Sequence, residues 1–248
     1  MSKGTKLSLV LLSLTFLLMA ALMSGLIKSE SWEINKIDIR AEFKRVSSEQ
    51  IRMAVLSYPQ RSFFKVKADV IRDELIKLPW VQKVTVNKKW PNTIIIKLVE
   101  HKAVAIWNEN KLLNDKGEIF EVDGFDNLEV LPKLIGVENQ ASQIWDKYLR
   151  FNKIVQTFGY DLVSTRVSKR GGWELYLSNG SVVNLGSQNM DARLVRLAET
   201  WSKLLKKIKT EPHYIDLRYT NGYAIKWQKP QVNEHDLIEQ KDTGNING

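Results

Sequence analysis

The chain has 248 residues, of which 44% are hydrophobic, so it is long enough for one large or two small domains with a packed core. It contains no cysteine, which excludes a disulfide framework and a thiolate nucleophile. The formal net charge is +9, but basic and acidic residues are interspersed along the sequence. A nucleic-acid reader concentrates its Lys and Arg on one face or in one motif, so we expect no nucleic-acid partner.

An uncharged stretch lies close to the N-terminus, at residues 7–27. As a helix with a rise of about 1.5 Å per residue, it would span the roughly 30 Å hydrocarbon core of a membrane. Lys3 and Lys6 precede it and no acidic residue does, so the positive-inside rule places residues 1–6 in the cytoplasm and Lys28 onward on the other side. A cleaved signal peptide is the alternative. An uncleaved anchor is favoured because the run exceeds the usual apolar region of about 7 to 15 residues and lacks a clear A-x-A cleavage site.

The next part of the chain predicts a strand, two helices and a hairpin. Alternating side chains favour a strand over 32–40, and Ser47 with Gln50 forms a capping box that opens the first helix. Apolar residues at helical spacing predict the second helix over 68–78. Strands on either side of Pro91-Asn92 complete the hairpin. This order, with helices on one face of a small sheet, is the arrangement of a POTRA module.

The second half of the chain predicts short strands and two amphipathic helices. The strands are expected at 104–107, 111–113, 118–122, 162–170, 173–177 and 182–185, and the helices at 142–158 and 190–208.

A closing hairpin is expected from His213 to Trp227. Two β-rich runs there flank Asn221-Gly222, a dipeptide that suits a tight two-residue turn. If the strand 223–227 lies at a sheet edge, its unpaired backbone groups are available to a partner strand. Residues 230–248 are polar with few large apolar side chains, so this tail is expected to be disordered.

Three stretches resemble one protein family. They are LPWVQKVTVNKKWPNTIIIKLVE at 78–100, AIWNENKLLNDKGEIF at 105–120 and YIDLRYTNGYAIKW at 214–227. They look like the POTRA signature, its continuation and the closing hairpin of the bacterial cell-division FtsQ/DivIB family, and the resemblance covers nearly the whole chain.

The resemblance implies an α+β fold. A single N-terminal transmembrane helix would lead to a POTRA domain of β-α-α-β-β order. A β domain of mostly antiparallel sheet would follow, with flanking helices and an exposed C-terminal edge strand. The implied boundaries are 1–6 for a cytoplasmic tail, 7–27 for the membrane helix, 28–101 for the POTRA domain, 102–229 for the β domain and 230–248 for the disordered tail.

The resemblance also implies a non-enzymatic scaffold of the division complex. It would be a single-pass type II protein of the inner membrane at the division septum, with its C-terminal domain in the periplasm. FtsB, which travels with FtsL, would bind by adding β-structure to the C-terminal edge strand. The scaffold would link early and late division proteins, through the POTRA domain and the membrane helix as well, to control septal peptidoglycan synthesis. No cofactor and no small-molecule substrate are implied.

Carried over residue by residue, the resemblance implicates a set of partner-binding residues: Arg170, Arg218, Tyr219, Gly222, Tyr223 and Trp227. It also implies a second interaction surface on the POTRA domain, with Val86 and Lys88 as candidates. Arginine offers a bidentate fork to a partner carboxylate, and tryptophan supplies a large buried contact. Without the resemblance, Arg218 would be interpreted as a solvated cross-strand charge and Trp227 as a core aromatic.

No pattern in the sequence predicts a catalytic or metal site. His101, His213 and His235 are far apart with no cysteine to complete a ligand set. Asp216 and Glu199 could form a carboxylate pair for glycan cleavage, but nothing in the sequence fixes their separation. A signal-anchored periplasmic enzyme acting on peptidoglycan is the alternative function. A POTRA chaperone or secretion module is a third, and it predicts a downstream β-barrel that we do not expect here.

Overall fold

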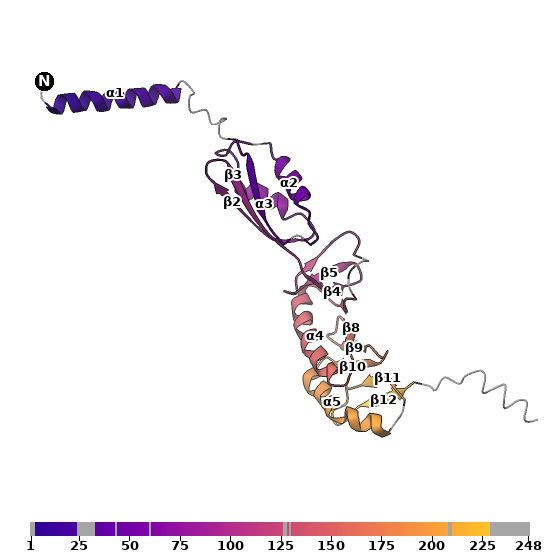
Figure 1. Cartoon of the computed structure of the whole chain (residues 1–248). Coiled ribbons are helices and arrows are strands. Elements are labelled where there is room, and N and C mark those ends of the chain that lie inside the picture. The colour runs from indigo at the N-terminus through magenta and orange to yellow at the C-terminus, as the bar shows by residue number, and fades with distance from the viewer. Residues whose placement is uncertain are drawn as a thin grey trace, which may run out of the picture. The chain divides into compact units, whose positions relative to one another are not determined.

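The computed structural model describes residues 3–23, 33–42, 44–59, 61–125, 128, 130–207 and 210–228. The chain divides into two compact units, Met1–His101 and Lys102–Gly248. Figure 1 shows helices and strands in both units, which confirms the predicted α+β class.

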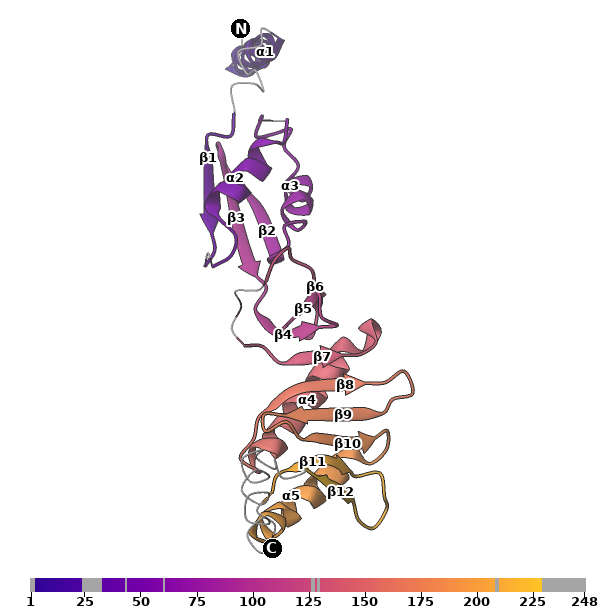
Figure 2. The same cartoon turned by 90° about the vertical axis from the view of Figure 1, so that its right-hand side faces the viewer.

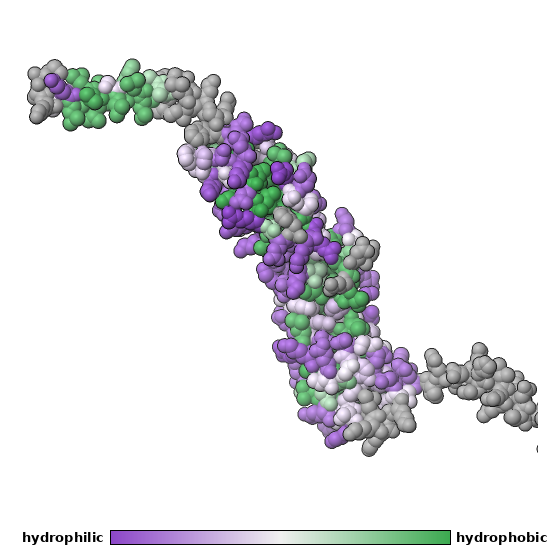
Figure 3. Space-filling view, in the orientation of Figure 1, coloured by the Kyte–Doolittle hydropathy of each residue, from purple (hydrophilic) through white to green (hydrophobic). Residues whose placement is uncertain are grey.

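The N-terminal element is the apolar helix α1, Lys3–Met23. Its segment Gly4–Ala21 is long and apolar enough to cross a membrane. Its apolar side chains point outward, with Phe16 75% exposed, and colour the helix green in Figure 3. Hydroxyl side chains donate hydrogen bonds to carbonyls of the preceding turn at Ser8, Ser13 and Thr15. Since polar groups in lipid must be satisfied internally, α1 fits a membrane anchor. Residues 24–27 of the predicted span lie outside the described residues.

The rest of the first unit is a three-stranded sheet in the order β1-β3-β2. β1 (Lys36–Arg40) runs parallel to β3 (Thr93–Glu100), and β2 (Val81–Lys89) pairs with β3 antiparallel. Helices α2 (Ser48–Leu56) and α3 (Ala68–Leu75) cover one face of this sheet (Figure 2). The predicted β-α-α-β-β order is therefore confirmed.

Local sequence signals explain the ends of these helices. The Ser47 hydroxyl accepts a hydrogen bond from the Gln50 amide (3.1 Å), and the Gln50 side chain accepts one from the Ser47 amide (2.9 Å), which confirms the predicted capping box. The helix α3 ends at Leu75, short of the predicted residue 78. The chain turns earlier because the Leu78 amide bonds to the Leu75 carbonyl and the Val81 amide bonds to the Leu78 carbonyl, which leads directly into β2.

The second unit contains a nine-stranded sheet in the order β12-β11-β10-β9-β8-β7-β4-β5-β6. The strands are β4 (Ala103–Trp107), β5 (Lys111–Asn114), β6 (Ile119–Phe120), β7 (Lys133–Ile135), β8 (Leu162–Val167), β9 (Trp173–Leu177), β10 (Val182–Gly186), β11 (Pro212–Asp216) and β12 (Ala224–Trp227). The pairs β10–β11, β7–β8 and β4–β7 are parallel and the remaining pairs are antiparallel. The sheet is therefore mixed, with antiparallel pairs in the majority.

Helices α4 (Ala141–Gln156) and α5 (Met190–Lys207) lie along one face of this sheet, and the short 3-10 helix η2 (Glu138–Gln140) leads into α4 (Figure 1). The predicted last residue of α5, at 208, lies outside the described residues. The buried core between helices and sheet includes Phe151, Val155, Leu175, Leu194 and Leu197. On its opposite face the strands β8 to β11 carry a row of polar side chains, Arg166, Glu174, Asn184 and Asp216. This open face is where the candidate site lies.

The tight turn predicted at Asn221-Gly222 is wrong. The last pairing of β11 with β12 joins Asp216 to Ala224, so residues 217–223 form a longer connection. A two-residue turn of the expected type needs positive φ, which neither Asn221 nor Gly222 adopts. Leu217 is buried at the start of the connection. Side chains of α5 hold the rest of it, and a sequence pattern within the hairpin cannot show this.

Candidate protein-binding site

The strand β12 forms one edge of the nine-stranded sheet. Within the described part of the chain its one strand partner is β11, as the predicted exposed edge requires. Side chains alternate along it, with Ala224 and Lys226 exposed and Ile225 and Trp227 half-buried. Ile225 packs against the core of the unit. The outer backbone groups of β12 are thus placed to pair with another strand.

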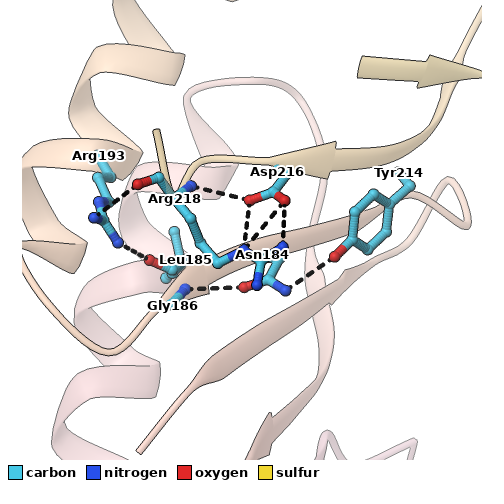
Figure 4. A network of polar contacts seen from close by, with 7 residues as sticks. All are labelled: Asn184, Leu185, Gly186, Arg193, Tyr214, Asp216 and Arg218. Atoms are coloured by element: carbon cyan, nitrogen blue, oxygen red, sulfur yellow. Dashed lines mark hydrogen bonds and ion pairs between the residues drawn. The ribbon is translucent and has the colours of Figure 1, made fainter. Parts of the chain in front are cut away.

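Arg218 follows β11 and is bound to Asp216 in a bidentate ion pair. Its Nε donates to Asp216 Oδ1 at 2.9 Å and its Nη2 donates to Oδ2 at 2.7 Å (Figure 4). The Asp216 side chain is 11% exposed and that of Arg218 is 60% exposed. Hydrogen bonding from Arg218 lowers the pKa of the Asp216 carboxyl below its ordinary value. The Arg218 guanidinium therefore already neutralises an acid of its own unit.

Arg170 and Arg218 are distant in sequence but line the same hollow on the open face, with a volume of about 340 Å³. Arg166, Glu174 and Asn184 contribute to its floor. These three residues are cross-strand neighbours, with Arg166 opposite Glu174 and Glu174 opposite Asn184. The hollow is polar and arginine-rich, so it is suited to a carboxylate.

The next residues of the connection lie beside the start of β12. A shallow hollow is lined by residues 219–224, which include three of the sequence-predicted residues, Tyr219, Gly222 and Tyr223. Tyr219 is 58% exposed, whereas Tyr223 is half-buried and its hydroxyl lies 2.6 Å from Thr200 Oγ1. Trp227 stands at the other end of β12, where its Cα pairs with that of Pro212. Tyr219, Gly222 and Tyr223 therefore lie on the connection, and Trp227 lies on the edge strand.

Two arginines of α5 hold this connection in place and were missed by the sequence reasoning. Arg193 donates to the carbonyls of Leu185 (2.7 Å) and Arg218 (3.0 Å), as Figure 4 shows. Arg196 donates to the carbonyls of Thr220, Tyr219 and Gly222 at 2.7, 3.1 and 3.0 Å. We call Arg193 and Arg196 the arginine clamp. In the sequence they are simply polar positions of an amphipathic helix, and no local signal shows that they reach carbonyls of a later loop.

Gly186 makes room for Arg193 of the clamp and for Arg218. Its φ is +70°, and a Cβ there would lie 2.8 Å from Arg193 Nη1 and 3.1 Å from Arg218 Cγ. The register between β9 and β10 shifts at Asn184/Gly186, and the Asn184 side chain accepts a hydrogen bond from the Gly186 amide (2.9 Å). Glycine is needed here both for the left-handed backbone and for the close approach of Arg193 and Arg218.

The two candidates of the first unit lie on β2. Val86 is half-buried and packs against the core of that unit. The Lys88 ammonium donates to the Val66 carbonyl at 3.1 Å and lies 4.9 Å from the centroid of the Phe63 ring. Both side chains therefore have contacts within their own unit.

The described residues offer no support for a metal or paired-carboxylate site. Among them, no group of three or more His, Cys, Asp or Glu side chains could hold a metal ion. Asp216 is held by Arg218 on the open face of the sheet, in line with Asn184. Glu199 is an exposed residue of α5, which covers the other face. The carboxylate pair considered from the sequence therefore has its members on different sides of the sheet.

The fold defines a POTRA-containing protein with an apolar N-terminal helix and a C-terminal edge strand open to pairing. Residues 33–101 match the family model "POTRA domain, FtsQ-type", and residues 105–218 match "Cell division protein FtsQ/DivIB, C-terminal". The second match ends before β12, so this strand is identified as an edge by its place in the sheet alone.

Several curated relatives align over most of the chain. It is 31% identical over 221 residues to Cell division protein FtsQ of Xanthomonas campestris pv. campestris, covering 88% of this chain and 78% of that protein. It is 31% identical over 208 residues to the FtsQ of Shewanella oneidensis, with coverages of 84% and 79%. It is 28% identical over 238 residues to that of Escherichia coli, with coverages of 91% and 86%. The chain belongs to the FtsQ/DivIB family of cell division proteins, which confirms the resemblance found in the sequence.

Proposed function

We propose that the chain is a non-enzymatic scaffold of the bacterial division complex that binds FtsB, together with FtsL, by β-augmentation at β12. The observation that carries this proposal is the position of β12, whose outer edge is unpaired among the described residues. A strand of FtsB adds to that edge, and backbone hydrogen bonds supply affinity. Half-buried Trp227 and Ile225 offer remaining apolar surface that the partner covers.

The polar hollow fixes the register of the partner. Within the described residues Arg170 has no ion pair, whereas Arg218 is held by Asp216. An acidic side chain of FtsB therefore binds Arg170 first, and Arg218 contributes through its exposed face. Tyr219, Gly222 and Tyr223 border the start of β12 and contact the end of the added strand.

The membrane helix confines this surface to the inner membrane at the septum. We assign residues 1–6 to the cytoplasm and 7–27 to the membrane, because Lys3 and Lys6 favour the cytoplasmic side. The POTRA domain, 28–101, and the β domain, 102–229, then lie in the periplasm. The tail, 230–248, lies outside the described residues.

Other division proteins bind elsewhere on the chain. The second surface lies on the POTRA domain around Val86 and Lys88, and the membrane helix offers a third. Through these contacts the scaffold links early and late division proteins and controls septal peptidoglycan synthesis.

Affinity measurements with purified FtsB–FtsL and the full chain in detergent micelles test the proposal. Trp227→Ala, Arg170→Glu and Arg218→Glu should each weaken binding by about 2 kcal/mol or more if these residues are interface hot spots. Trp90→Ala is the matched control, because Trp90 is 65% exposed on the first unit.

Wild-type affinity in all three folded variants would contradict the assigned site. Release of wall fragments from sacculi by the purified chain, abolished by substitution of one carboxylate, would contradict the non-enzymatic role.

A further inference from the structure

The connection between β11 and β12, residues 217–223, is held mainly by side chains rather than by a backbone turn. Its first residue is tied by the Leu217 amide to the Asn184 carbonyl (2.9 Å). For the following carbonyls, of residues 218, 219, 220 and 222, the hydrogen-bond partners found in the described structure are guanidinium groups of α5. The conformation of this connection therefore depends on a helix that is not part of the hairpin.

The contacts follow the helix in the same order as the loop. Arg193 binds the carbonyl at the exit of β11, Arg196 binds the middle of the loop, and Thr200 meets the Tyr223 hydroxyl directly before β12 begins. Positions 193, 196 and 200 are three and four residues apart, so they share one face of α5. One helix face thus determines how the chain leaves β11 and how it enters the edge strand.

Arg196 has the central place in this arrangement. Its two terminal nitrogens make the bonds to Tyr219, Thr220 and Gly222, while its Nε is buried without a hydrogen-bond partner in the described structure. A buried donor without a partner costs free energy, so the other contacts of Arg196 have to offset this cost. The three hydrogen bonds to the loop carbonyls are the contacts that do so.

We propose that Arg196 is a positioning residue for partner binding, which holds the connection so that β12 presents its outer edge in strand geometry before the partner arrives. This inference rests on the proposed function of β12 as a docking edge. Arg196 itself points to the loop carbonyls of its own chain and contacts no partner residue. Its contribution to affinity is preorganisation, which reduces the ordering cost of association.

The test compares variants of the full chain in detergent micelles. Arg196→Gln removes the guanidinium, and Arg196→Lys retains the charge with fewer donors. Lys203→Gln is the control, because Lys203 is an exposed residue of the same helix and the same charge is lost. Two quantities are measured: amide hydrogen exchange of residues 217–228 in the absence of a partner, and the affinity for purified FtsB–FtsL.

The expected result is local. Arg196→Gln speeds exchange in 217–228 and leaves exchange in β8 and β9 unchanged. If it lowers the population of the competent edge to roughly one tenth, the apparent affinity falls roughly tenfold, through a slower association rate. Arg196→Lys shows an intermediate loss, and Lys203→Gln matches the wild type. A merely structural role would instead raise exchange throughout the second unit.

Unchanged exchange and affinity in Arg196→Gln would overturn the inference, as would a rise of equal size in β8 and β9. If Arg196→Gln fails to fold, Arg196→Lys gives the same comparison. If the wild type does not bind FtsB–FtsL, the proposed partner is wrong, and the exchange comparison alone decides whether Arg196 positions β12.

Discussion

The strand β2 is one edge of the sheet in the first unit and β12 is one edge of the sheet in the second, and these two strands differ in what they expose. The strand β2 of the first unit extends over Val81–Lys89 and carries exposed lysines at 83, 88 and 89. The strand β12 of the second unit is only Ala224–Trp227, with a single lysine at 226. Lysines on an edge disfavour unplanned strand pairing. The strand β2 is therefore protected against pairing with another strand along its length. The strand β12 instead combines an open backbone edge with half-buried apolar side chains that a partner can cover.

The two edges also differ in their support. The strand β2 pairs with β3 from Val81 to Lys89, so its own ladder fixes its geometry. The strand β12 pairs over a short range with β11 and is reached through a connection held by the arginine clamp. An edge intended for a specific partner can thus be short, provided that another element positions it.

Among changes that weaken the support of β12, substitution of Gly186 should lower the free energy of unfolding most. Gly180 also has positive φ, +82°, but nothing lies within 4 Å of a Cβ placed there, so it is the matched control. Gly180→Ala should lower the free energy of unfolding by about 1–2 kcal/mol, the cost of a left-handed alanine. Gly186→Ala should lower it by about 3 kcal/mol, because the new Cβ also displaces clamp hydrogen bonds. Denaturant unfolding measures both, and equal losses would show that the hydrogen bonds of Arg193 contribute nothing to stability.

A smaller loss of stability is expected when acid protonates Asp216. Because its ion pair with Arg218 lowers the pKa of Asp216, this carboxylate stabilises the folded state above its unfolded pKa of about 3.9, and the contribution is lost as the pH falls below that value. In Asp216→Asn this part of the acid dependence should disappear, at a cost of at most about 1 kcal/mol at pH 7. Thermal unfolding between pH 7 and pH 3 measures it.

Asp146→Asn removes an exposed carboxylate of α4 and is the control for the acid experiment. If the Asp216 and Asp146 variants keep the same acid dependence as the wild type, the ion pair does not stabilise the connection.

The smallest effect on stability concerns the lysines of β2. Lys83→Thr with Lys89→Thr should change the free energy of unfolding by no more than about 0.5 kcal/mol, since both side chains are exposed. The same double variant should self-associate more strongly, because the edge has lost its protective charges. Sedimentation velocity detects this, with Lys65→Thr and Lys77→Thr as the control pair outside the sheet. Equal self-association of the two variants would remove the protective role assigned to β2.

Local signals predicted the fold well where short-range contacts determine it. The capping box at Ser47 and Gln50 and the alternation of Ile94, Ile96 and Leu98 in β3 involve neighbours in sequence. The strand β7 was missed because three residues, Lys133–Ile135, are too few to show alternation, and its pairing with β4 and β8 is parallel and non-local.

The candidate site was less accessible to sequence reasoning. Arg170 and Arg218 were named through the family resemblance, but only the sheet brings them into one hollow. The prediction of a two-residue turn was wrong. Asn221-Gly222 is a typical hairpin dipeptide, but hydrogen bonds from Arg196 to the loop carbonyls hold a longer connection. Helix periodicity shows which face of α5 is buried and does not show which flanking arginine reaches a loop.

Disulfide cross-linking in cells can show whether FtsB pairs with the outer edge of β12, because the chain has no cysteine of its own. Cysteine at Ala224 or Lys226, both exposed on β12, would be combined with single cysteines along FtsB. Paired strands bring Cα atoms to about 4.5–5.5 Å, within the range of a disulfide. We expect cross-links at alternate FtsB positions, displaced by two residues between the 224 and 226 variants, and none from cysteine at Asn87 of β2. Cross-links from Asn87 instead of β12, or a pattern without alternation, would contradict pairing at this edge.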